Sequence, residues 1–140
     1  MSLLAAENAF KRGLVAAVDG RDLEAAACFR QALRLHEQRG KPPQWRYLSY
    51  YGLSLARAHG PRAEAIQACE AAVRAVGAGA QAHLNLGRVY RIAGRARDAA
   101  STFLRGLELA PGHPTLLAEL ARVERFAWPT APTASRSTVR

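Results

Sequence analysis

Small and large apolar residues recur along this chain at nearly constant intervals. The set nearest the C-terminus consists of Gly94, Ala99, Phe103, Gly106 and Leu107. Each of its members lies 34 residues after its counterpart in an upstream set, which consists of Gly60, Ala65, Cys69, Ala72 and Val73. A first set with the same internal spacing lies 40 residues before the second and consists of Gly20, Ala25, Phe29, Ala32 and Leu33. Repetition of such a pattern near 34 residues predicts stacked helical hairpins.

Apolar residues also recur at three- and four-residue steps, which predicts helices. Seven helices are expected, over residues 3–18, 22–38, 44–58, 61–76, 80–93, 96–109 and 114–126. Gly20 can adopt the left-handed conformation that ends a helix, Asp22 is placed to cap the next one, and Pro114 suits a first helical turn. No alternation of apolar and polar residues persists over six residues, so nothing supports a sheet. The chain is therefore expected to be all-α.

The last of these helices is expected to close the stack, because stacked repeats need a terminal element with one polar face. Its apolar side should cover the last hairpin through Leu116, Leu117, Leu120 and Val123. Its polar side should face solvent through Glu119, Arg122 and Arg125. We expect one domain over residues 1–127, followed by a disordered tail over 128–140 that is rich in Ser, Thr, Pro and Ala.

The hairpin pattern resembles that of the tetratricopeptide repeat (TPR) family. In that family the first helix carries a large residue, Leu-Gly and Tyr, and the second carries Ala, Phe and Ala before a closing Pro. The third repeat matches at His83, Leu86, Gly87, Tyr90, Ala99, Phe103, Gly106 and Pro111. The second matches at Leu48, Tyr51, Gly52, Leu55, Ala65, Cys69 and Ala72. The first matches more weakly, at Ala9, Arg12, Gly13, Ala16, Ala25, Phe29 and Ala32.

The resemblance implies a right-handed α-solenoid of three TPR hairpins, with repeats over about 6–39, 45–79 and 80–113 and a capping helix over 114–126. Gly87 and Ala99 should let the two helices of a hairpin touch. The first helix of each hairpin should line a concave face, while the second covers the outside. Domains of this kind usually bind partners and do not catalyse reactions.

Charge narrows the class of partner. The net charge is +9, and 18 of the 20 basic residues are arginine. A positive field attracts acidic partners, although a GC-rich genome would favour arginine and alanine together and produce the same composition. Charge alone does not distinguish an acidic peptide from nucleic acid. Cys28 and Cys69 lie within apolar patterns, so we expect both to be reduced and buried.

Motifs that carry chemistry are missing from the sequence. There is no Ser–His–Asp set, no paired carboxylates and no glycine-rich phosphate loop, so we do not expect an enzyme. The four histidines lie more than twenty residues apart, so neither a metal site nor a cofactor is expected. No apolar run is long enough to span a membrane, and the first residues lack the layout of a signal peptide. We therefore expect a cytoplasmic protein without membrane insertion.

The residues opposite the packing positions should face the concave surface. In the first helix these are Glu7, Phe10, Lys11, Leu14 and Val18. In the third they are Arg46, Ser49, Tyr50, Leu53, Ala56 and Arg57. In the fifth they are Gln81, Leu84, Asn85, Arg88, Arg91 and Ile92. From these we predict peptide-binding residues at Lys11, Arg46, Ser49, Tyr50, Leu53, Arg57, Asn85, Arg88 and Arg91.

These side chains favour a protein-interaction scaffold or adaptor that binds a peptide or helix of a partner. Arginine forks match carboxylates, so an acidic segment is the natural candidate, and the Asn85 amide could bond a peptide backbone. Some TPR domains clamp the carboxylate of chaperone tails with Lys, Asn and Arg residues. The matching positions here do not agree in type, so this mode is not expected; they are Phe10, Leu14, Tyr50, Gln81 and Asn85.

Two alternatives remain open at this point. The chain could be a homo-oligomeric assembly element, because Leu3, Leu4 and Phe10 would be partly exposed at the uncapped end of the first hairpin. It could also bind nucleic acid through its arginines. The second alternative is less favoured, because the basic residues are spread around several helices and the aromatic residues form no stacking platform.

Overall fold

Seven helices account for nearly all of the described chain in the computed structural model, which covers residues 2–42 and 44–127. They are α1 (Ser2–Val18), α2 (Asp22–Glu37), α3 (Trp45–Arg57), α4 (Arg62–Arg74), α5 (Ala80–Ile92), α6 (Ala96–Leu109) and α7 (Pro114–Ala127). Every predicted helix is present, with both ends within two residues of the prediction, and the described residues contain no strand. The all-α prediction is confirmed. The tail predicted to be disordered, 128–140, lies outside the described residues.

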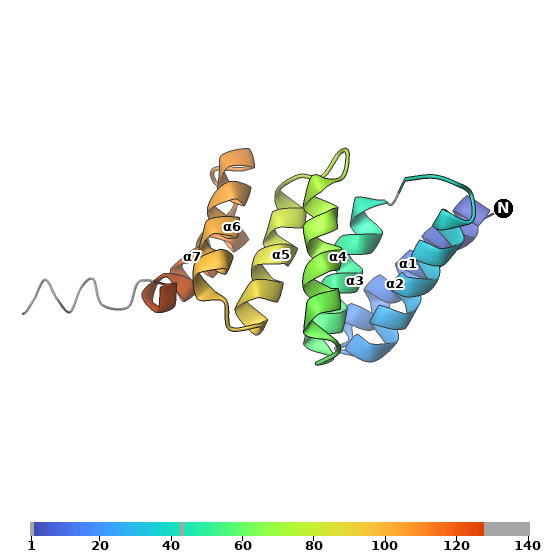
Figure 1. The fold of residues 1–140 in the computed structure, drawn as a ribbon, viewed down its shortest axis with the longest axis horizontal. Coiled ribbons are helices and arrows are strands. Elements are labelled where there is room, and N and C mark those ends of the chain that lie inside the picture. Colours follow the sequence, from blue (N-terminus) through green and yellow to red (C-terminus); the bar gives the residue numbers. More distant parts are fainter. Residues whose placement is uncertain (1, 43, 128–140) are drawn as a thin grey trace, which may run out of the picture.

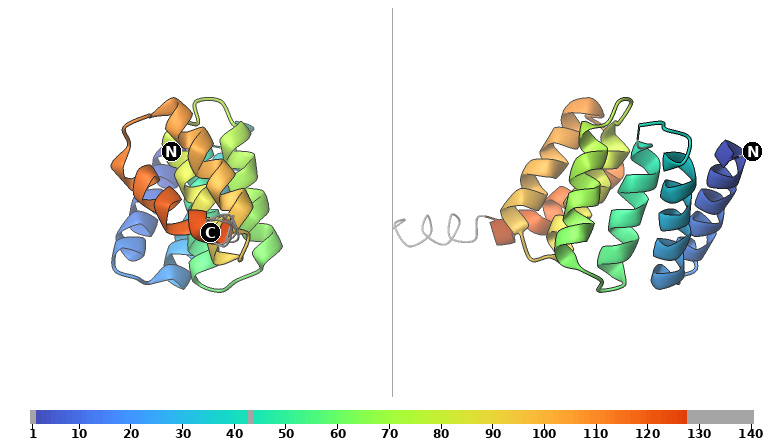
Figure 2. Two further views of the ribbon diagram at one scale, coloured as in Figure 1. Left: turned by 90° about the vertical axis from the view of Figure 1, so that its left-hand side faces the viewer. Right: turned by 45° about the vertical axis from the view of Figure 1, so that its right-hand side comes forward.

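Consecutive helices form antiparallel hairpins that stack side by side along the long axis of the molecule (Figure 1). The pairs are α1 with α2, α3 with α4 and α5 with α6, and α7 closes the end of the stack opposite the N-terminus. Figure 2 shows the same order of helices from two further directions. The helix α3 packs against α5, and α7 packs mainly against α6 and over a shorter stretch against α5.

A glycine of the first helix allows close packing within each hairpin. A side chain added at any of the three glycines would collide with the second helix. The contacting pairs are Gly13 with Phe29, Gly52 with Cys69 and Gly87 with Phe103. The predicted role of Gly87 in bringing two helices together is therefore confirmed.

The turns between helices agree with the predicted glycine positions. Gly20 has a φ of 78° and Gly94 a φ of 79°, the left-handed conformation in which glycine avoids the strain of a side chain. The predicted cap at Asp22 is wrong, because Asp22 is the first residue of α2 and Arg21 occupies the capping position without a side-chain bond. Pro114 begins α7 as predicted.

Two predictions about side-chain exposure at the ends of the stack are corrected. Phe10 is buried, because the rings of Phe29, Tyr47 and Tyr50 surround it with centroids 5.0–5.9 Å away. On α7, Leu116 and Val123 cover α6 as expected, but Leu117 is 48% exposed.

Glu119 takes the inward position between Leu116 and Val123, because residues three and four apart share one side of a helix.

Of the two cysteines, Cys69 is fully buried and Cys28 is only partly buried.

Candidate peptide-binding surface

The first helices of the hairpins form a continuous row with α7, and we call its solvent side the first-helix face. Side chains of α1 and α3 meet at Glu7 and Arg46, α3 meets α5 at Ser49 and Asn85, and Glu119 joins α7 to α5. The predicted binding residues all belong to this row, but the structure places them at very different depths.

Between α1 and α3, the Glu7 carboxylate accepts hydrogen bonds from two side chains. Arg46 Nη2 lies 3.1 Å away and the Tyr47 hydroxyl 2.8 Å away. The bond from Arg46 lowers the pKa of Glu7 against the opposing effect of its burial. Burial and the bond to Glu7 raise the pKa of Tyr47 to about 12. The guanidinium of Arg46 also lies 4.8 Å from the centre of the Phe10 ring, so this arginine is partly engaged within the fold.

Between α3 and α5, three of the predicted residues are covered by protein. Ser49 and Asn85 are both 0% exposed, and Leu53 is 4% exposed. Asn85 Nδ2 donates to Ser49 Oγ over 2.9 Å, and Gln81 Nε2 donates to Asn85 Oδ1 over 3.0 Å. The expectation that these side chains contact a ligand is corrected. The two helices pack directly against each other, so positions assigned to the groove lie in a helix contact instead.

Tyr50 lies at the middle of the row and stays partly exposed. Its burial raises the pKa of the phenol, while the hydrogen bond with Asn85 and the charges of Arg88 and Arg46 act in the opposite direction. Tyr50 is the aromatic residue that the sequence analysis predicted beside the arginines of this face.

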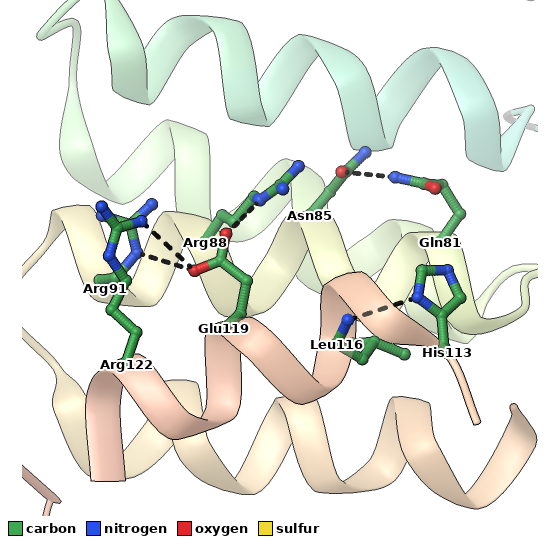
Figure 3. Close-up of polar contacts among 8 residues, drawn as sticks. All are labelled: Gln81, Asn85, Arg88, Arg91, His113, Leu116, Glu119 and Arg122. Atoms are coloured by element: carbon green, nitrogen blue, oxygen red, sulfur yellow. Dashed lines mark hydrogen bonds and ion pairs between the residues drawn. The ribbon is translucent and has the colours of Figure 1, made fainter. Parts of the chain in front are cut away.

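Between α5 and α7, arginines gather around the buried carboxylate of Glu119, which is 6% exposed (Figure 3). Arg88 Nε donates to Oε2 over 2.6 Å. The other oxygen, Oε1, lies 3.4 Å from Arg91 Nε and 3.7 Å from Arg122 Nη1. Arg91 Nε and Glu119 Oε1 are buried and have no hydrogen-bond partner among the described residues. The prediction that Glu119 faces solvent is therefore wrong.

The charge of this cluster is far from balanced. Arg57, at the end of α3, is exposed, and its pKa is lowered first by desolvation and then by the charges of Arg88 and Arg91, against the opposing effects of Asp22 and Glu119. We call Arg57, Arg88, Arg91 and Arg122 the arginine cluster. Among the described residues, neither Arg57 nor the exposed Lys11 of α1 takes part in an ion pair. The single carboxylate of Glu119 therefore lies close to three guanidinium groups, those of Arg88, Arg91 and Arg122.

Two pockets lie beside the arginine cluster. One, of about 320 Å³, lies between α5 and α7 and is lined by Arg88, Thr115, Ala118, Glu119 and Arg122. The other, of about 400 Å³, has an apolar wall that includes the exposed ring of Phe126, and it is lined by Arg91, Gly94, Ala96, Arg122, Val123 and Phe126. Cationic and apolar surfaces therefore adjoin at this end of the face. Within residues 2–42 and 44–127, no group of His, Cys, Asp and Glu side chains is arranged to hold a metal ion.

Solved structures share this arrangement of helices over most of the chain. A TPR domain of Arabidopsis OM64 matches with a TM-score of 0.74 and 19% identity, covering 89% of this chain and 98% of that domain. The chain has the TPR fold. The second TPR domain of human RPAP3, in complex with the HSP70 peptide SGPTIEEVD, matches with a TM-score of 0.70 and 18% identity, covering 89% and 96%. No family model matches the sequence, and no curated protein is significantly similar to it.

The residue of this surface that sequence reasoning missed is Glu119. A signal for its burial was present, because Glu119 follows Leu116 by three positions and precedes Val123 by four. That spacing places it on the apolar side of α7. An acidic residue on that side needs cations nearby, and α5 supplies Arg88 and Arg91.

None of the described helices is both long enough and apolar enough to cross a bilayer.

Proposed function

We propose that this TPR domain is a non-catalytic protein-interaction scaffold that binds an acidic peptide or helix of a partner on the first-helix face. The observation that carries the proposal is the arginine cluster, whose charge Glu119 balances only in part. Binding of a peptide by the RPAP3 domain, which has the same fold, supports a peptide as the partner. The side chains with surface left for contact are Lys11, Arg46, Tyr50, Arg57, Arg88 and Arg91.

The mode of binding should differ from a chaperone-tail clamp. Of the positions that match such a clamp, Phe10 and Asn85 are buried in this structure. Cationic residues lie instead near the C-terminal ends of α3 and α5, at Arg57 and Arg91. We therefore expect acidic side chains along a partner segment to bind there, because guanidinium groups pair with carboxylates through two parallel hydrogen bonds.

Charge reversal at Arg57 tests the site, because Arg57 forms no ion pair in the described structure and its replacement should not disturb the fold. We expect R57E to weaken binding of a fluorescein-labelled hexaglutamate peptide at least tenfold, measured by fluorescence anisotropy at fixed salt. The matched control is R105E, which makes the same charge change at an exposed position of α6. Equal weakening by the two variants would show that only net charge matters and would refute the site.

A second candidate function, self-association, is favoured by one observation on α1. Its side chains Leu4, Val15 and Val18 are 66%, 59% and 87% exposed. Their spacing places them along one side of the helix together with the exposed Lys11, where no other described element covers them. These apolar side chains could pair with those of a second copy.

A further inference from the structure

The first-helix face carries its own acidic residue at the point where an acidic ligand would bind. Glu119 is the single carboxylate among the ion pairs of α5 and α7, and it is almost completely buried. Its Oε2 is bonded to Arg88, whereas its Oε1 lies between Arg91 and Arg122 without a hydrogen bond. Figure 3 shows the carboxylate pointing from α7 towards the arginines of α5.

The arginine side chains remain partly exposed in spite of these pairs. The side chains of Arg88, Arg91 and Arg122 are 22%, 30% and 63% exposed. Three guanidinium groups lie within 4 Å of the one carboxylate of Glu119, so its single negative charge does not balance theirs. A second anion on the solvent side would pair with the exposed parts of these side chains, and it would compete with Glu119 for the positive charge of Arg88 and Arg91.

Loss of the Glu119 charge should leave α7 in place. The helix is held against α6 by Leu116, Val123 and Ala127, which are all buried. Its contact with α5 is short by comparison. The carboxylate therefore acts on the arginines of α5 more than on the position of its own helix.

We propose that Glu119 is a built-in competitor for acidic ligands, so that this residue of α7 sets the affinity of the arginine cluster for partner carboxylates. The inference rests on the proposed function of the first-helix face. Glu119 engages Arg88 through a hydrogen bond and Arg91 through an ion pair, and a partner carboxylate takes over part of these interactions. Neutralising Glu119 releases those donors entirely to the partner.

The test compares Glu119→Gln with Glu124→Gln, which makes the same charge change at an exposed position of the same helix. The probe is fluorescein-labelled hexaglutamate at fixed salt. We expect E119Q to bind it three- to tenfold more tightly than wild type, and E124Q less than twofold more tightly. Equal gains in affinity for hexaglutamate in the two variants would show that Glu119 acts only through its contribution to the net charge. Weaker binding by E119Q would show that Glu119 pre-arranges the arginines, and either result overturns the inference.

A second measurement uses the wild-type protein and does not depend on the folding of a variant. The Nε–H signals of Arg88 and Arg91, assigned in nitrogen-proton spectra through R88K and R91K, should shift when hexaglutamate is added. Signals that stay fixed while the peptide binds would contradict competition for these donors. If hexaglutamate binds neither wild type nor E119Q, the proposed acidic partner fails together with the inference. Binding without any effect of E119Q removes the inference alone.

Discussion

At the scale of single residues, the tightest constraint in the stack is the glycine on each first helix. A methyl group added at Gly52 would lie 2.5 Å from Cys69 Sγ and 2.7 Å from the carbonyl oxygen of Ala65. The oxygen belongs to the backbone of α4, so it cannot rotate away as a side chain would. Any residue other than glycine must therefore push α3 and α4 apart.

We expect Gly52→Ala to lower the free energy of unfolding by about 1–3 kcal/mol, the usual cost of overpacking a well-packed contact. Urea unfolding followed by circular dichroism measures the change. The control is Gly112→Ala, where an added methyl group meets nothing within 4 Å. Its effect should stay within about 0.5 kcal/mol. Equal destabilisation of both variants would show that the α3–α4 contact is not the cause.

At the scale of helices, each contact along the row is made by different chemistry. The α1–α3 contact combines aromatic rings with the ion pair of Glu7 and Arg46. The α3–α5 contact is neutral and includes the hydrogen bond between Ser49 and Asn85, whereas the α5–α7 contact includes the ion pair of Arg88 and Glu119. Acid that protonates Glu7 should therefore weaken the α1–α3 contact and leave the α3–α5 contact unchanged.

The pH dependence of stability tests the α1–α3 contact. The pKa of Glu7 is lowered from its ordinary value of 4.5 in the folded protein, first by the bond from Arg46. Its stabilisation is therefore complete above the unfolded pKa and is lost as pH falls through the folded pKa. We expect Glu7→Gln to melt below wild type at pH 7, and the difference to disappear in acid. The exposed control Glu108→Gln should show no such pH-dependent difference. A difference in melting temperature between Glu7→Gln and wild type that stays constant with pH would contradict this role of Glu7.

At the scale of the whole molecule, the two ends of the stack offer different surfaces. The α1 end presents a stripe of exposed apolar side chains that includes Val15 and Val18. The α7 end combines exposed Phe126 with the arginine cluster. An apolar end favours a second copy of the chain, and a cationic end favours an acidic partner.

Solution mass decides whether the apolar end is used. Self-association through α1 predicts that the mass measured by light scattering rises from 15.1 kDa towards twice that value with concentration. The double variant V15E/V18E should then remain at the monomer mass. Leu109→Glu, at an exposed position of α6, should behave as wild type. A wild-type mass that stays at 15.1 kDa at every concentration contradicts self-association.

The helices, their ends and their pairing into hairpins were all predictable from the sequence. Apolar spacing, turn glycines and the glycine–aromatic pairs act over distances that a single hairpin spans. For this reason the sequence placed Gly87 at the contact between two helices, but it paired Gly87 with Ala99, whereas in the structure a side chain added at Gly87 would meet Phe103. The surroundings of Glu119 could not be predicted in this way, because the arginines of α5 that it meets lie about thirty residues away in sequence.

Local periodicity determined, by itself, that this chain folds as stacked helical hairpins, because hydrogen bonding and small-to-large packing within a hairpin involve near neighbours. Only the tertiary structure decided which side chains of the row stay accessible. That outcome depends on how closely α3, α5 and α7 approach one another, which buries Ser49 and Asn85 while leaving Arg57 exposed. The inward turn of Glu119 follows from the same packing, since only a folded stack brings Arg88 close to it.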